Sequence, residues 1–579
     1  MTLAQTKGVY RHFVTVGRGQ LHYRRAGDGP PLVLLHAAPF SSESLEHKLL
    51  DLSGRFTVMA VDLPGYGGST AIADPQPRLA DYAAALTAFL DAVGVAQACF
   101  YGEGEGGAVA MALAASAPAR VKALAVNGVP DIAPGDRNAF VRELPDLTPR
   151  WDGAHLCAAW SWLNEHAVFA PFHMRTAARR IHEPPPSTHD LQRRLVQILS
   201  MPSQGRAAFA VTRAALDLDA EAALTAFAGP CLITGAFDAK AHDLAERLSG
   251  RNGVVAKSSQ DAWRLIMRFF AAQAENLRLA PVPSAPPARA IPGAMASRYV
   301  EVGGGQMHAW FNDDADTLPL VVQHDAASSV GTVAPILEEL IGRRRLIAFD
   351  LPGSGLSDAF LPEGTTVADY AGALASALSQ SGLTEVDVYG MWGGGFVGLD
   401  MAFANPRLVR RLVMSNAFFH EGEELRAVQE HYTPSVAPVW HGGHLMQAWR
   451  QMRDQGLFYP WFDRSAQGIL RREPFLATEM VHERVCSLLK AGDWYASAYH
   501  SHFVYPTLER LSRSPVPTLL ASTSWDPNYP HVMDIVARTP GCDYLELEQD
   551  FTRWGVSFLP WLEADDAPSG GAGHLFQQP

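Results

Sequence analysis

The stretch Asp62-Leu63-Pro64-Gly65-Tyr66-Gly67 recurs as Asp350-Leu351-Pro352-Gly353-Ser354-Gly355, 288 residues further along the chain. Three more landmarks repeat at the same separation: a strand-end histidine, a Tyr-Gly pair and an aspartate that ends an apolar run. They are His36 and His324, Tyr101-Gly102 and Tyr389-Gly390, and Asp238 and Asp526. A fixed period of this length indicates an internal duplication of one folded unit.

Within each copy, short apolar runs alternate with longer amphipathic segments. In the first copy the short runs are Leu32–Leu35, Val58–Val61, Ala98–Tyr101, Leu124–Val126 and Leu232–Thr234. Their nearly continuous hydrophobicity is typical of parallel strands that helices cover on both faces. The sequence therefore predicts an α/β protein with two tandem domains, each a mostly parallel sheet flanked by helices. Ligands of such sheets bind beyond the carboxyl ends of the strands.

The domain boundaries follow from composition. A chain of 579 residues is too long for a single core. We expect one domain over residues 1–278 and a second over 297–566. The proline- and alanine-rich stretch 279–296 between them reads as a semi-rigid linker, and the glycine-rich stretch 567–579 reads as a disordered tail.

Charge, hydropathy and cysteine spacing exclude several classes of protein function. Net charge is −13 without a basic cluster, so nucleic acid is not an expected partner. No stretch of eighteen apolar residues occurs and the N-terminus lacks a signal-type apolar core, so we expect a soluble cytoplasmic protein with no membrane partner. The five scattered cysteines lack a C-x-x-C pair, and no metal-type histidine spacing or phosphate loop appears. We expect no metal and no cofactor, and leave a homo-oligomer open.

These residues together resemble the α/β-hydrolase superfamily, in the branch that includes epoxide hydrolases, haloalkane dehalogenases and carbon–carbon bond hydrolases. The resemblance rests on the features already quoted, on Pro39 after His36, and on the glycine-rich stretches Gly102–Gly107 and Gly390–Gly395. It implies that these stretches form the family's nucleophile elbow. It also implies a helical lid at about residues 131–225 and 420–511, which would shape a pocket for a small organic molecule.

The chain departs from the family where chemistry is expected. The central residue of a G-x-S-x-G elbow is the nucleophile, and here that position holds Gly104 in one copy and Trp392 in the other. Neither side chain can form an acyl-enzyme. The orienting carboxylate corresponds to Asp238 and Asp526, but no histidine follows the next strand in either copy. The resemblance therefore implies two degenerate catalytic triads.

The lids share a W-x-G-x-H-L-x-x-A-W pattern, which brings His155 and His444 beside tryptophans in both copies. An imidazole here would serve either as an acid/base or as a local structural hydrogen-bonding group. Asp325, which follows His324, would offer a general base beside the oxyanion hole. The candidate catalytic residues are thus His444, Asp325, Asp526, His155 and Asp238, and the candidate substrate-binding residues are His324, Trp392, Trp440, Trp449, His36 and Gly104.

The sequence is compatible with two alternative functions. The first is a hydrolase or lyase that uses non-serine chemistry on a small organic substrate, with the second copy the better candidate because it is richer in His, Trp and Asp. The second is a catalytically inactive ligand-binding or scaffold protein with the hydrolase fold.

Overall fold

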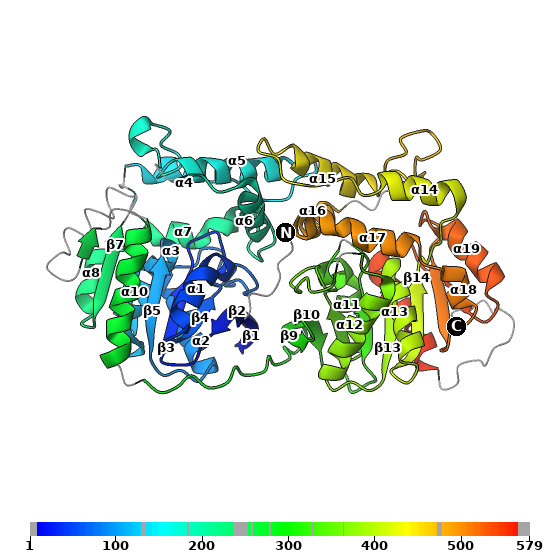
Figure 1. The fold of residues 1–579 in the computed structure, drawn as a ribbon, viewed down its shortest axis with the longest axis horizontal. Coiled ribbons are helices and arrows are strands. Elements are labelled where there is room, and N and C mark those ends of the chain that lie inside the picture. Colours follow the sequence, from blue (N-terminus) through cyan, green and yellow to red (C-terminus); the bar gives the residue numbers. More distant parts are fainter. Residues whose placement is uncertain are drawn as a thin grey trace. The chain divides into compact units, whose positions relative to one another are not determined.

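The computed structural model describes residues 8–128, 132, 135–181, 184–235, 253–255, 259–276, 279–326, 328–362, 364–471 and 477–564. Internal contacts divide the chain between Arg289 and Ala290 into an N-terminal and a C-terminal unit, and the division falls inside segment 279–296. Each unit contains one sheet flanked by helices (Figure 1). The predicted fold class is therefore confirmed.

The sheet of the N-terminal unit has the strand order β1-β2-β4-β3-β5-β6-β7-β8. The first two strands pair antiparallel with their neighbours, and the pairs from β4 to β8 are parallel. Every apolar run that the sequence analysis singled out lies in one of these strands. The bounds are β1 Tyr10–Val16, β2 Gly19–Ala26, β3 Pro31–Leu35, β4 Thr57–Val61, β5 Ala98–Glu103, β6 Val121–Asn127, β7 Cys231–Gly235 and β8 Gly253–Val255.

The C-terminal unit repeats this topology, with the order β9-β10-β12-β11-β13-β14-β15-β16. The register repeats as well, because β3 pairs Leu32 with Cys99 on β5, and β11 pairs Leu320 with Asp387 on β13. The bounds are β9 Ala296–Val302, β10 Gly305–Asn312, β11 Leu320–Gln323, β12 Leu346–Phe349, β13 Val386–Met391, β14 Val409–Ser415, β15 Thr518–Ser522 and β16 Asp543–Glu546.

Helices cover both faces of each sheet, and a helical insertion separates β6 from β7 and β14 from β15. The sheet-flanking helices are α1 Glu46–Ser53, α2 Leu79–Ala92, α3 Glu105–Ser116, α10 Ser259–Asn276, α11 Ala334–Leu340, α12 Val367–Gln380, α13 Gly393–Ala404, α19 Tyr529–Arg538 and α20 Trp554–Glu563. The inserted helices are α4 Arg137–Glu143, α5 Ala154–Val168, α6 Thr188–Leu199, α7 Ala210–Ala215, α8 Ala220–Ala226, α14 Gly422–His431, α15 Gly443–Asp454, α16 Thr478–Ala491, α17 Tyr495–Phe503 and α18 Thr507–Leu511.

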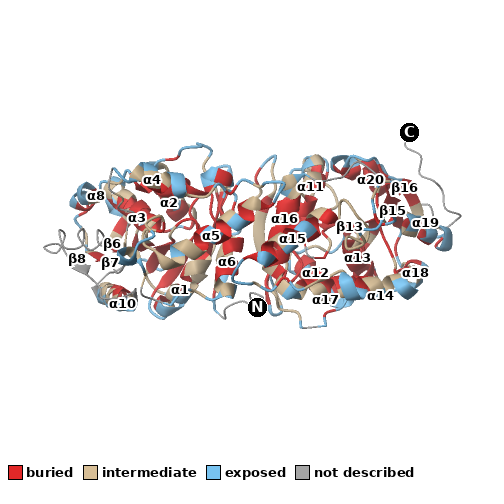
Figure 2. Ribbon diagram, turned by 90° about the horizontal axis from the view of Figure 1, so that it is seen from above, coloured by how far each residue is buried: buried red, intermediate tan, exposed pale blue. Residues whose placement is uncertain are grey.

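The central strands form the core of each unit, and exposed residues gather on the outer helix faces (Figure 2). The repeated Asp-Leu-Pro-Gly turn is anchored by its aspartate. Asp62 Oδ1 accepts from Ser42 N at 2.6 Å, and its Oδ2 lies 2.7 Å from His22 Nδ1. Asp350 pairs with His308 in the same way at 2.8 Å. This buried pair explains why the turn recurs in the sequence.

Part of the predicted linker packs on the N-terminal unit. Arg25 donates to the carbonyl of Pro283 at 2.6 Å, and Thr15 Oγ1 donates to the carbonyl of Arg289 at 3.0 Å. The predicted tail lies outside the described residues. No helix within the described ranges combines the length and hydropathy needed to cross a membrane.

Candidate functional site

Both sharp bends form, and their central residues have nearly the same backbone dihedral angles. Gly104 has φ 50° and ψ −118° between β5 and α3, and Trp392 has φ 49° and ψ −122° between β13 and α13. A left-handed φ costs a tryptophan more than a glycine, so the surrounding structure holds Trp392 in place. Trp392 N donates to the carbonyl of Ser415 at 2.9 Å. The bend therefore persists although neither residue offers an attacking oxygen.

The N-terminal unit encloses a cavity of about 280 Å³ lined mainly by aromatic and aliphatic side chains. Its main charged group is Glu105, the residue after the bend. Glu105 Oε2 accepts from Ala38 N at 3.0 Å, and Oε1 accepts from Thr212 Oγ1 at 2.9 Å. Burial raises the pKa of this carboxyl. The Glu105 carboxyl group therefore engages the backbone amide of Ala38 in the loop after β3.

Replacing Glu105 with glutamine is expected to stabilise the N-terminal unit by about 1 kcal/mol at pH 7, because it removes a buried charge and keeps hydrogen-bonding atoms. The folded pKa lies above the ordinary value of 4.5, so the wild-type penalty is present at neutral pH and disappears as pH falls towards 4.5. The difference in unfolding midpoint between variant and wild type should therefore shrink on acidification.

Glu103 supplies the matched control for this experiment. It precedes the bend, and its Oε1 pairs with Lys48 Nζ at 2.6 Å and accepts from the Tyr101 hydroxyl at 2.5 Å. Glu103→Gln should not stabilise the unit, because it weakens an existing ion pair. Equal effects of the two substitutions would contradict the assignment of an unpaired charge to Glu105.

The C-terminal unit has a larger cavity of about 470 Å³. Its lining combines side chains from the sheet edge with aromatic and polar side chains from the inserted helices. The sheet-side residues include Asp325, Met391, Trp392, Trp525, Asp526 and Asn528, and those of the insertion include Phe418, His420, Tyr432, Gln455, Tyr459, Met480, Arg484, Tyr499 and Phe503. Gln549 and Asp550 also line it. Aromatic walls with a few polar groups suit a small organic ligand.

Asp325 is the best-positioned acidic group of this cavity. Its Oδ1 accepts from Gly393 N, the amide after the bend, at 3.0 Å. The same oxygen lies 3.4 Å from Nδ1 of the buried His502, whose ring packs over Gly393. Here the carboxylate comes from the loop and engages the amide of the bend, the reverse of the arrangement at Glu105. Each unit thus places one of its own acidic side chains on a backbone amide, Glu105 on Ala38 N and Asp325 on Gly393 N.

Of the predicted site residues, the structure brings Trp392, Asp325 and Asp526 to one cavity. Asp526 Oδ1 accepts from Asn528 N at 2.8 Å. Gly104 lies at the N-terminal bend, where an added Cβ would meet the Ala37 Cβ at 3.3 Å. Asp238 lies outside the described residues.

The strand-end histidines contact backbone rather than either cavity. His36 Nε2 accepts from Leu63 N at 3.0 Å, and His324 Nε2 accepts from Leu351 N at 3.1 Å. Both side chains are fully buried, and desolvation lowers the pKa of each imidazole. They tie the ends of β3 and β11 to the Asp-Leu-Pro-Gly turns that follow β4 and β12. Their role in substrate binding stays a prediction.

The histidines of the shared insertion motif also make backbone hydrogen bonds. His155 Nδ1 accepts from Arg150 N at 3.1 Å, and His444 Nδ1 accepts from Val439 N at 3.2 Å. Burial lowers the pKa of His444 to about 4, so it is neutral at pH 7. Neither lies among the residues that line the described cavities. The structural interpretation of the motif fits this geometry, and the acid/base interpretation stays a prediction.

The two tryptophans of that motif in the C-terminal unit lie apart from the cavity. Trp440 is 70% exposed, and Trp449 is only 1% exposed, packed inside the insertion. Trp440 lies in the turn before α15 and Trp449 lies on α15, and neither is among the residues that line the described cavities. Trp392 and Trp525 line the cavity instead.

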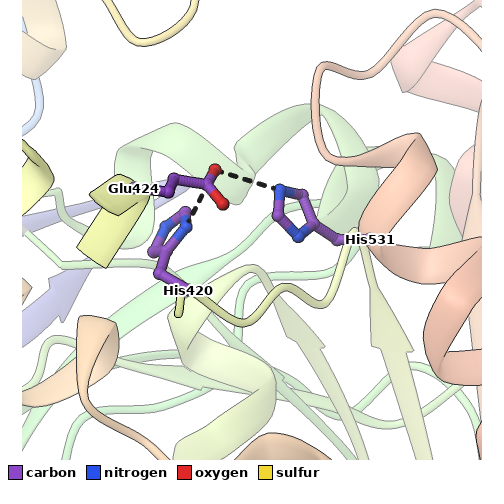
Figure 3. Close-up of side chains that lie close together, drawn as sticks. All are labelled: His420, Glu424 and His531. Carbon is purple, nitrogen blue, oxygen red and sulfur yellow. Dashed lines mark ion pairs between the residues drawn. The ribbon is translucent and has the colours of Figure 1, made fainter. Parts of the chain in front are cut away.

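Sequence reasoning missed a further cluster in the C-terminal unit. His420, Glu424 and His531 each present a ligand-type atom, and these atoms lie within 4.8 Å of one another. Figure 3 shows the Glu424 carboxylate between the two imidazoles. The i, i+4 spacing of His420 and Glu424 is visible in the sequence, whereas His531 joins them only through the fold.

Comparison with known proteins agrees with this architecture. The sequence profile of the α/β hydrolase fold family matches residues 30–199. Bifunctional epoxide hydrolase 2 of Mus musculus is 33% identical over 144 residues, which are 24% of this chain and 24% of that protein. A putative carbamate hydrolase, RutD of Yersinia enterocolitica, is 36% identical over 84 residues, covering 14% of this chain and 30% of its own. The chain thus matches about a quarter of the length of these relatives.

Solved structures align with a length of chain that corresponds to one of the two units. An enol-lactonase from Burkholderia xenovorans covers 46% of this chain and all of its own, with 17% identity and a TM-score of 0.37. The family profile matches part of the N-terminal unit, and the C-terminal unit repeats the strand order of that unit. The two strand-to-helix bends carry glycine and tryptophan.

Proposed function

We propose that the C-terminal unit is a non-serine hydrolase or lyase that acts on a small, largely apolar organic molecule. The observation that carries the proposal is the position of Asp325 in the wall of the 470 Å³ cavity, beside the bend that carries Trp392. Degenerate triads in both copies are part of this proposal, because the bends supply no nucleophilic oxygen or sulfur.

Asp325 is suited to act as a general base. The Gly393 amide holds Oδ1, and this contact fixes the carboxylate against the bend. His502 Nδ1, 3.4 Å from the same oxygen, helps to orient it. The carboxylate would take a proton either from a water molecule that attacks the substrate or from an acidic C–H bond next to a substrate carbonyl.

Phenols of the insertion would stabilise developing negative charge on the substrate. Because Asp325 engages the Gly393 amide, the usual backbone donor of the bend is not available to an oxyanion. Tyr432 and Tyr499 line the same cavity. Burial raises the pKa of Tyr499 to about 12 and that of Tyr432 well above its ordinary value, so both remain O–H donors at neutral pH. Trp392 would form an apolar wall against the substrate.

The proposal predicts turnover that resists serine-directed reagents. The purified full chain would be assayed against uncharged epoxides, carbamates, lactones and esters, with and without prior treatment with a fluorophosphonate. At least one class should be turned over at the same rate after treatment, because no activated serine takes part. Loss of activity together with a phosphonate adduct on a serine would overturn the proposal.

A second function, ligand binding without turnover, is favoured by one observation. Both units direct a carboxylate onto an oxyanion-hole amide, through Glu105 to Ala38 and through Asp325 to Gly393. A hydrolase that stabilises an oxyanion there would be inhibited by this charge. Saturable quenching of tryptophan fluorescence by a member of the panel, with no product formed, would support this function over catalysis.

A further inference from the structure

Three metal-ligating side chains converge where the inserted helices of the C-terminal unit meet α19. His420 precedes α14, Glu424 lies in the first turn of α14, and His531 lies in the first turn of α19 (Figure 3). His420 Nδ1 and His531 Nε2 face the same oxygen, Glu424 Oε1, at 3.1 and 3.3 Å. Three electron-rich atoms this close need a proton or a cation between them.

These distances fit coordination of a metal. Zinc bonds of about 2.0–2.2 Å to imidazole nitrogen and carboxylate oxygen, at tetrahedral angles, place neighbouring ligand atoms about 3.3 Å apart. Both measured separations lie close to this value. Two histidines and one carboxylate are also the ligand set of metal sites that keep open coordination positions.

The environment favours a formed site over a loose surface cluster. The His420 side chain is 2% exposed and that of His531 is 17% exposed. Their rings contact each other with centroids 5.5 Å apart, and Phe418, Phe419 and Phe503 pack against one or the other. Packing of this kind fixes ligand orientation before an ion arrives.

We propose that His420, Glu424 and His531 bind one divalent transition-metal ion of the zinc type. Because imidazole nitrogens provide two of the three ligands, Zn²⁺ should bind far more tightly than Mg²⁺. His420 also lines the 470 Å³ cavity, so the site adjoins the cavity wall. The proposal uses neither Asp325 nor any catalytic step, and therefore does not depend on the proposed function.

The site is tested by titrating the chelator-treated full chain with Zn²⁺ in an isothermal titration calorimeter. Wild-type protein should bind one ion per chain with high affinity, whereas Mg²⁺ should not compete. Glu424→Gln and His531→Ala should each weaken this binding at least about tenfold, because each removes one of three ligands. Circular dichroism would check that both variants are folded.

His431→Ala is the matched control, because His431 lies on the same helix near Glu430 and is 53% exposed. It should titrate like wild type. Co²⁺ in place of Zn²⁺ adds an optical readout, since its visible bands should appear in wild type and His431→Ala and vanish in His531→Ala. If His531→Ala and Glu424→Gln bind Zn²⁺ as wild type does, or if wild type binds none, the proposal fails.

Discussion

Replacement of Asp325 by asparagine is expected to lower kcat about 100- to 10,000-fold, because the amide cannot accept the proton that a general base must take. The amide oxygen can still accept from Gly393 N, which Asp325 Oδ1 does at 3.0 Å. KM should change little, since the size of the side chain and its place in the cavity wall are retained. Initial rates over a substrate range, with the substrate found in the panel assay, measure both constants.

Thermal unfolding separates this effect from a loss of structure. The midpoint of Asp325→Asn should stay near that of wild type, because the contact with the bend survives. Asp534→Asn is the control, since Asp534 is a half-exposed partner of Arg538 on α19, outside the cavity lining. A kcat unchanged in Asp325→Asn, or a rise in KM alone, would show that Asp325 only binds or shapes the ligand.

The sequence was sufficient to predict the strands of the two sheets and the two strand-to-helix bends. Strand assignments such as Leu32–Leu35 were correct because buried parallel strands leave a local, continuous apolar signal. Gly104 and Trp392 were located through the resemblance of their glycine-rich stretches to a nucleophile elbow, and a bend at the end of a strand is a local feature of the chain.

The site was less predictable because its contacts join distant segments. His155 and His444 repeat in both copies, and each accepts a hydrogen bond from the backbone N–H of the residue five positions earlier, just before a helix. His502 and Asp325 are separated by strands β12, β13 and β14 and by most of the insertion, and no spacing rule links them. Only packing of α17 over the bend reveals the pair.

The position of the Glu105 side chain was also not predictable from the local sequence. A residue beside an elbow nucleophile ordinarily points away from the pocket, and Glu103 follows that rule by pairing with Lys48. Glu105 instead reaches the Ala38 amide and lines the cavity. The direction of a side chain at a bend depends on partners such as Thr212 from α7, which the local sequence cannot indicate.

Asp387→Ala should destabilise the C-terminal unit by about 3–5 kcal/mol, because it leaves two guanidinium groups near the core without their counter-ion. Asp387 on β13 is fully buried. It accepts from Arg344 at 2.7 Å and from Arg410 at 2.9 and 2.6 Å, the latter as a two-pronged contact. Arg344 itself is 3% exposed, so water cannot replace the lost carboxylate.

The N-terminal unit provides the comparison. At the equivalent place, 288 residues earlier, stand Cys99, Phe56 and Lys122, and the first two are fully buried. A thiol and a phenyl ring thus fill a position that the C-terminal unit fills with an ion pair. Cys99→Ala should therefore cost only the packing of one sulfur, about 1 kcal/mol, because no charge is left uncompensated.

Scanning calorimetry of both variants measures the predicted difference. The triple variant Asp387→Cys, Arg344→Phe and Arg410→Lys, which carries the residues of the N-terminal unit, should recover most of the stability that Asp387→Ala loses. Recovery is expected because replacing a buried ion network as a whole removes the desolvation penalty together with the attraction. A loss below about 1 kcal/mol in Asp387→Ala would mean that solvent reaches the Arg344 guanidinium group, contrary to its burial.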